Sequence, residues 1–73
     1  MKLTDYKHDI LALATARGVT VDVGLEMFLH NVELGKNFTQ GVSTDYAALK
    51  PHYAELSTQK DEFMEEFRKQ WKK

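Results

Sequence analysis

The sequence predicts an all-α protein, a small compact bundle of three main helices plus a short extra helix before Pro51. Apolar residues recur at steps of three and four in three long segments, which is the spacing of one helix face. Glycines 18 and 35 follow two of these segments, and no stretch alternates in the pattern of a strand. Seventy-three residues, 42% of them hydrophobic, are enough for one core, so we expect residues 1–73 to form a single helical domain.

The first helix is expected to begin at Thr4 and to end at Arg17. Thr4 is the predicted N-cap, with an acidic residue in the turn that follows it. A basic residue suits the last turn, and Gly18 is the predicted C-terminal stop. The apolar stripe of this helix consists of Tyr6, Ile10, Leu13 and Ala14, with Leu11 beside it.

The second helix is expected over 21–34, the most apolar run of the chain. Thr20 is the predicted N-cap, its hydroxyl accepting from a first-turn amide, and Asp22 suits the positive end of the helix dipole. Gly35 is the predicted stop. A helix that is apolar over most of its circumference needs neighbours on most sides, so we expect it at the centre. Its apolar residues are Val21, Leu25, Phe28, Leu29 and Val32 on one face, widened by Val23 and Met27.

The connection 36–43 contains two apolar side chains, Phe38 and Val42, which we expect to plug the edge of the core. Ser43 is the predicted N-cap of a short helix at 44–49. Pro51 lacks an amide proton and disfavours helical backbone in the residue before it, so a longer helix is expected to start there.

A second break is predicted at Ser57-Thr58, where Thr58 and Asp61 form a capping box for the last helix. Acidic residues open that helix and basic residues close it, which matches the helix dipole. The predicted core is Ile10, Leu11, Ala14, Leu25, Phe28, Leu29, Val32, Tyr46, Leu49, Tyr53, Leu56, Phe63 and Phe67.

Composition narrows the range of functions. The absence of cysteine excludes disulfides, thiolate metal sites and thiol nucleophiles. Ten basic and eleven acidic residues give a formal charge of -1, without the basic excess typical of nucleic-acid binders. The N-terminal stretch lacks the apolar core of a signal peptide, and no run is long enough to span a bilayer, so we expect a cytoplasmic protein.

Candidate catalytic and metal-binding residues are few. Glu26 and His30 are four apart and share a helix face, but two ligands do not make a metal site. Nothing nearby in the sequence supplies a third ligand, and His8 and His52 are the other plausible metal-binding or acid–base imidazoles. The serines lack the strand–turn–helix context of a nucleophile, and the glycines do not form a phosphate loop. We therefore expect no enzyme, no catalytic residue, no metal and no cofactor.

The short link at residues 18–20 resembles the tight turn of a helix-turn-helix motif. In such motifs the second helix reads DNA with polar and basic side chains near its N-terminus. Here that end offers Asp22 and Glu26, which would face phosphates, and apolar residues suited to burial. The short link makes a DNA-binding or transcription-modulating protein the alternative prediction. The acidic and apolar residues make nucleic acid the less favoured partner.

The last helix carries an aromatic row, with Phe63, Phe67 and Trp71 at i, i+4 and i+8 and Met64 alongside. Two interpretations stay open: these residues close the core, or some of them dock into another protein or a second copy in a homodimer. The polar face mixes Glu with Lys, which does not favour a membrane surface. The sequence thus predicts a non-enzymatic protein–protein interaction module (an adaptor, inhibitor or regulatory accessory protein) with Phe63, Met64, Phe67 and Trp71 as candidate partner-binding residues.

Overall fold

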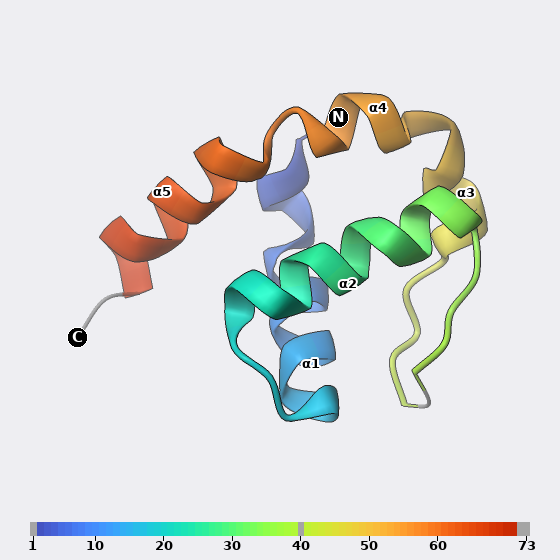
Figure 1. Cartoon of the computed structure of the whole chain (residues 1–73), viewed down its shortest axis with the longest axis horizontal. Helices are drawn as coiled ribbons and strands as arrows, with labels where there is room; N and C mark the ends of the chain where they lie inside the picture. Colours follow the sequence, from blue (N-terminus) through green and yellow to red (C-terminus); the bar gives the residue numbers. More distant parts are fainter. Residues whose placement is uncertain (1, 40, 72–73) are drawn as a thin grey trace.

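A computed structural model describes residues 2–39 and 41–71, without the side chains of residues 70 and 71. This part of the chain is helical and contains no strand, so the predicted all-α class is confirmed (Figure 1). The elements in chain order are η1 (Leu3–Tyr6), α1 (Lys7–Arg17), α2 (Val21–Leu34), α3 (Tyr46–Leu49), η2 (Lys50–His52), α4 (Tyr53–Ser57) and α5 (Lys60–Trp71), η denoting a 3-10 helix.

Helix α2 has the predicted bounds. Gly35, just after it, has φ 68°, and its N–H returns to the carbonyls of Asn31 and Val32. Only glycine adopts this left-handed conformation without steric cost, which explains why the helix ends there. Thr20 occupies the N-cap position, but its hydroxyl makes no bond to the backbone and instead hydrogen-bonds the carboxylate of Asp22.

The start of the first helix differs from the prediction. Residues 3–6 form a 3-10 turn, the α-helix begins at Lys7, and Thr4 is not its N-cap. The reason is that Leu3 is buried in the core, and its N–H donates to Oε1 of Gln59 at 2.7 Å. The first turn is therefore held by a hydrogen bond to a residue near the other end of the chain.

The predicted Ser43 cap is also wrong, because Asp45 occupies the N-cap of α3 and accepts from the Ala48 N–H at 3.3 Å. Pro51 does not start a separate helix, since it lies in η2, which joins α3 to α4 without a gap. The predicted break after Ser57 is confirmed. There the Thr58 hydroxyl donates back to the carbonyl of Glu55 at 2.8 Å instead of forming a capping box.

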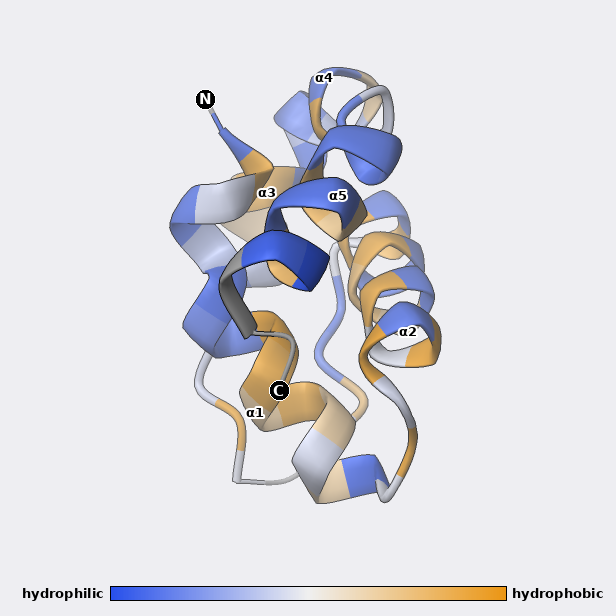
Figure 2. Cartoon of the chain, turned by 90° about the vertical axis from the view of Figure 1, so that its left-hand side faces the viewer, coloured by the Kyte–Doolittle hydropathy of each residue, from blue (hydrophilic) through white to orange (hydrophobic). Residues whose placement is uncertain are grey.

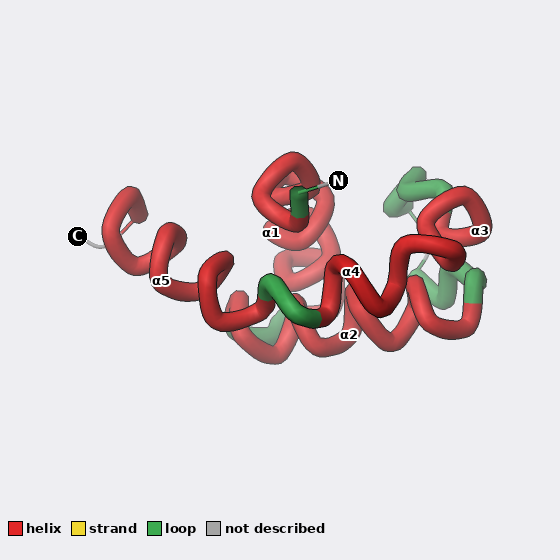
Figure 3. Tube along the Cα trace, turned by 90° about the horizontal axis from the view of Figure 1, so that it is seen from above, coloured by secondary structure: helices red, strands yellow, loops and turns green. Residues whose placement is uncertain are grey.

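Helix α2 is in contact with α1 and, toward its C-terminal end, with α3, η2 and α4 (Figures 1 and 3). Helix α5 runs outward from this group in both views, and it packs against η1.

Ten of the predicted core residues are buried, whereas Leu11, Tyr53 and Phe67 are only half-buried. The core also contains Leu3 and Leu13. The buried apolar residues are Leu3, Ile10, Leu13, Ala14, Leu25, Phe28, Leu29, Val32, Tyr46, Leu49, Leu56 and Phe63.

The molecule measures 33 × 25 × 15 Å. Two layers of helices packed about 8–10 Å apart account for the shortest dimension, so α2 has a covered side and an open side. Val23 and Leu34 on α2 are accordingly 44% and 45% exposed, and the expectation that neighbours cover this helix on most sides is wrong. In Figure 2, α5 is largely hydrophilic, whereas α1 and α2 carry long hydrophobic stretches.

Helices α1 and α2 lie close together at Gly24. A Cβ atom on this residue would lie 2.6 Å from Cβ and 3.1 Å from Cα of Ala14. Real Cβ atoms do not approach other carbons so closely, so the absence of a side chain here allows the two helices to pack in this way.

We expect Gly24→Ala to destabilise the protein by about 1–3 kcal/mol, because the added methyl group overpacks the crossing. At an open helix position the same change would instead stabilise by about 1 kcal/mol. Urea unfolding measures the difference. The double variant Ala14→Gly/Gly24→Ala should recover part of the loss, and a Gly24→Ala variant more stable than the parent would contradict this packing.

The fold also predicts a pH dependence at the start of α2. The hydroxyl of Thr20 lowers the pKa of Asp22 below its ordinary value of 3.8, with further lowering by backbone N–H groups and by the charge of Arg68. The ionised carboxylate therefore stabilises the fold, fully above the unfolded pKa and less as pH falls through the folded one. Asp22→Asn should lower the melting temperature at pH 7, and the gap should narrow as the pH falls below the ordinary pKa of 3.8. A gap of unchanged size in acid would rule out this electrostatic contribution.

Candidate functional site: a groove across helix α2

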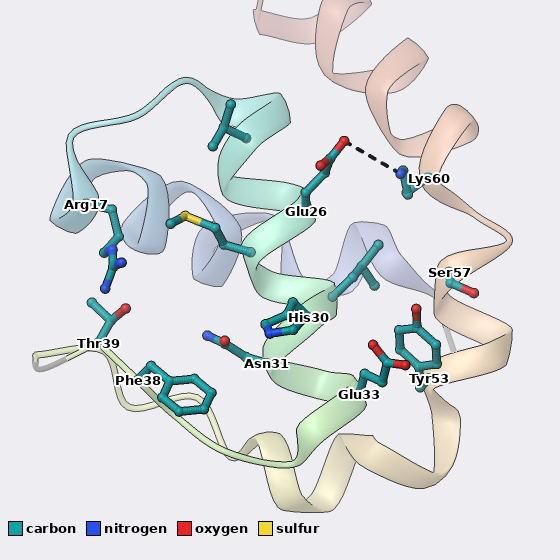
Figure 4. Close-up of a pocket in the computed structure, with 13 residues that line it drawn as sticks. Arg17, Glu26, His30, Asn31, Glu33, Phe38, Thr39, Tyr53, Ser57 and Lys60 are labelled. Atoms are coloured by element: carbon teal, nitrogen blue, oxygen red, sulfur yellow. Dashed lines mark ion pairs between the residues drawn. The ribbon is translucent and has the colours of Figure 1, made fainter.

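The open side of α2 is the floor of a groove of about 890 Å³ (Figure 4). This volume lies in the range of ligand-binding clefts, roughly 300–1,000 Å³. Of its lining residues only Leu29 and Asn31 are buried, so the groove is shallow and open to solvent. The lining residues are Arg17, Val23, Glu26, Met27, Leu29, His30, Asn31, Glu33, Phe38, Thr39, Tyr53, Ser57 and Lys60.

The loop after α2 holds an aromatic ring at the edge of this groove. The side chain of Asn37 spans the loop, since its Oδ1 accepts from the Thr39 N–H at 3.0 Å and its Nδ2 donates to the Val42 carbonyl. Phe38, between these anchors, is 54% exposed. The expectation that Phe38 plugs the core is therefore wrong, whereas Val42 is half-buried. Asn37 bonds to the backbone of Thr39 and Val42, both beyond Phe38 in the chain, and the ring stays largely in solvent.

The two flanks of the groove differ in charge. Figure 4 shows Arg17, Phe38 and Thr39 on one side of α2, and Tyr53 and Lys60 on the other. Acidic side chains line the groove as well, and on the second flank Nζ of Lys60 pairs with the Glu26 carboxylate at 3.8 Å. Glu33 points toward Tyr53 in the same view. The first flank therefore has a cation without an acidic neighbour, and the second has mixed charge.

A buried polar group lies between these flanks. Asn31 is only 5% exposed. Among the described residues, it is the one polar or charged residue that is buried. Its side chain lies near the hydroxyl of Tyr46, which is itself buried and has no hydrogen bond of normal geometry within the described residues. Burial raises the pKa of Tyr46, and the Asn31 and Thr44 side chains partly offset that rise. The Asn31 amide also lines the groove, so it connects the polar part of the core to the surface.

The aromatic row of α5 is divided by the structure. Phe63 is 1% exposed and part of the core, so its ring is not at the surface. Met64 and Phe67 are half-buried and pack against that core. A smaller hollow of about 370 Å³ lies where α5 faces η1 and the start of α1. The side chain of Trp71 lies outside the described residues, and partner binding by Met64, Phe67 and Trp71 stays a prediction.

The histidines lie apart from one another in the described structure. His30 lines the groove with Glu26, the helix-face neighbour predicted from the sequence. His8 is exposed on α1, and Nδ1 of His52 lies 3.7 Å from the carboxylate of Glu55. Within residues 2–39 and 41–71, no group of three His, Asp or Glu side chains is placed to hold a metal ion. None of the described helices has the length and apolar content needed to cross a bilayer.

Comparisons with protein-family models, with curated proteins and with solved structures find no match to this chain. No activity, ligand or partner can therefore be transferred from a relative. The shape and chemistry of the groove are the basis for a function.

Two sequence signals could have pointed to the groove. The first is Asn37, because an asparagine beside an apolar residue in a glycine-bounded connection is typical of a side-chain-organised turn. The second is the position of Val23, which lies on α2 away from its main apolar stripe. Neither signal shows which side of α2 the loop would border, since that depends on the packing of α3 and α4.

We expect Phe38→Ala to change the free energy of unfolding by no more than about 0.5 kcal/mol, because the ring contributes little to the core. Phe28→Ala, at a fully buried position, should cost about 3–5 kcal/mol. Urea titration of both variants gives the comparison. A loss for Phe38→Ala as large as that for Phe28→Ala would mean that the ring is buried in solution.

Proposed function

We propose that this protein is a non-enzymatic interaction module, such as an adaptor, inhibitor or assembly factor, which binds another protein in the groove across α2. The observation that carries the proposal is the exposure of Phe38 on a loop fixed by Asn37. An aromatic ring held in water by an ordered loop gains free energy when a partner covers it. The Asn37 hydrogen bonds beside this ring are formed without a partner.

The surroundings of Phe38 support this role. Val23 and Met27 also line the groove and supply further apolar surface for a partner to cover. Burial of such surface contributes roughly 25 cal/mol per Å². Aromatic side chains with charged residues around them are typical of the positions that dominate binding energy. The charged residues at the groove margins, Arg17, Glu26 and Lys60, fit this pattern.

Two contacts support binding over catalysis. The hydroxyl of Ser57, which lines the groove, donates to the backbone carbonyl of Ala54 at 3.1 Å, so its proton is already engaged. Glu26 is paired with Lys60, so this carboxylate is engaged as well. We also propose a cytoplasmic location, because a chain without cysteine needs no oxidising compartment to fold.

A protein partner is better supported than DNA. The exposed face of α2 carries Asp22, Glu26 and Glu33, and these carboxylates would repel phosphates if the helix approached a groove of DNA. The charge on the exposed face of α2 therefore disfavours a nucleic acid as the partner. DNA binding is kept as an outcome of the test.

The proposal is tested by selecting peptides from a display library on the immobilised chain. Selected peptides should bind the parent protein and lose at least about tenfold in affinity on Phe38→Ala, as expected for removal of an aromatic anchor. Leu34→Ala is the matched control, because Leu34 is similarly exposed but does not line the groove. It should leave affinity unchanged.

Three results would contradict the proposal. The first is that the selected peptides bind the Phe38→Ala variant as tightly as the parent protein. The second is that they lose affinity only for the Phe67→Ala variant, which would place the site on α5. The third is no selected peptide together with salt-sensitive retention on DNA, which would favour the alternative function.

A further inference from the structure

We propose that the Arg17 flank of the groove recognises an acidic peptide segment, in which a carboxylate side chain is adjacent to a large apolar one. This inference rests on the proposed function and specifies its partner. The flank combines a cation, a buried amide and an exposed aromatic ring, contributed by α1, α2 and the following loop respectively (Figure 4).

The cation is Arg17. It is the last residue of α1 and is exposed, and it forms no ion pair within the residues that the structure describes. In Figure 4 its guanidinium extends toward Thr39 along the groove. A guanidinium presents a planar set of N–H donors that matches the two oxygens of a carboxylate, so an acidic side chain is its complementary ligand.

The buried amide is Asn31. The residue is 5% exposed, yet it lines the groove and its side chain points toward the flank of Phe38 and Thr39 (Figure 4). A carboxamide has two N–H donors and one carbonyl acceptor, so a group that faces the groove can still bond to a ligand. A peptide backbone offers the matching C=O and N–H.

The apolar part of the flank is formed by Phe38 and Met27. A flexible thioether beside an exposed ring accommodates aliphatic or aromatic side chains of different shape. A carboxylate that reaches Arg17 and a backbone that meets Asn31 would place the neighbouring side chain of the peptide against these two residues. The three contacts together define a short motif of one acidic and one large apolar residue.

Charge distinguishes this ligand from a basic one. The acidic lining residues are Glu26 and Glu33, of which Glu26 is paired with Lys60 and Glu33 points toward Tyr53. A basic peptide would therefore meet Arg17 on the Phe38 flank without a compensating carboxylate. An acidic peptide meets the guanidinium on the Phe38 flank, whereas both glutamates point toward the other flank (Figure 4).

The test is an NMR titration of the full ¹⁵N-labelled chain with three end-blocked synthetic heptapeptides. They share the sequence Gly-Ser-Leu-X-Phe-Ser-Gly, in which X is Glu, Gln or Lys. The Glu peptide should shift the signals of Arg17, Asn31 and Thr39, and it should bind about three to ten times more tightly than the Gln peptide at low salt, since the pair is partly exposed. The Lys peptide should bind most weakly.

Arg17→Glu should reverse this order, so that the Lys peptide binds best. Lys36→Glu is the matched control, since it makes the same charge change at an exposed lysine that does not line the groove, and it should keep the parental order. Both positions are exposed, so the fold is expected to tolerate these variants.

Equal binding of the three peptides at Phe38 would overturn the acidic preference but leave the groove as an interaction site. An order that Arg17→Glu does not change would show that another cation makes the contact, and it would also overturn the inference. No shift of any groove signal by the three peptides would overturn it as well. The separate display selection would then decide whether the proposed function falls with it.

Discussion

The contact between Gly24 and Ala14 is the constraint on which the rest of the structure depends. It lets α1 and α2 approach to a distance that no larger side chain at position 24 would allow. Apolar residues on the facing sides of both helices, including Ile10 and Phe28, then meet in one core. The described helices form two layers, so covering one side of α2 leaves its other side open in this part of the chain.

The groove lies on the side of α2 that the described helices leave uncovered. The loop that carries Phe38 leaves the C-terminal end of α2 and turns back to α3 (Figure 1), and α3, η2 and α4 contact the C-terminal half of α2. The Asn37 side chain bonds to the backbone of Thr39 and Val42, and the ring of Phe38 stays largely exposed. A small domain thereby keeps an apolar surface in water, at a cost to solubility that a binding role would explain.

Local signals in the sequence predicted much of the fold. The end of α2 follows from Gly35, which acts within one helical turn, and Thr20 stands at the predicted N-cap position without a side-chain cap bond. The burial of Leu3 could not be predicted in this way, because it depends on a hydrogen bond to Gln59, 56 residues away. The exposure of Phe38 was missed for a related reason, since hydrophobicity alone does not show that this loop leaves the ring largely in solvent. Phe63, Met64 and Phe67 pack on the core to different degrees, and that division depends on tertiary packing that the spacing of α5 does not show.

The most direct test of the account is the exposure of individual phenylalanine rings in solution. NMR with ring-labelled phenylalanine and a soluble paramagnetic agent measures it, because broadening depends on how closely the agent approaches each ring. We predict strong broadening for Phe38 and protection for Phe28 and Phe63, which are buried. Protection of Phe38 equal to that of Phe28 would show that the loop closes over α2, and it would contradict the existence of an open, aromatic-edged groove.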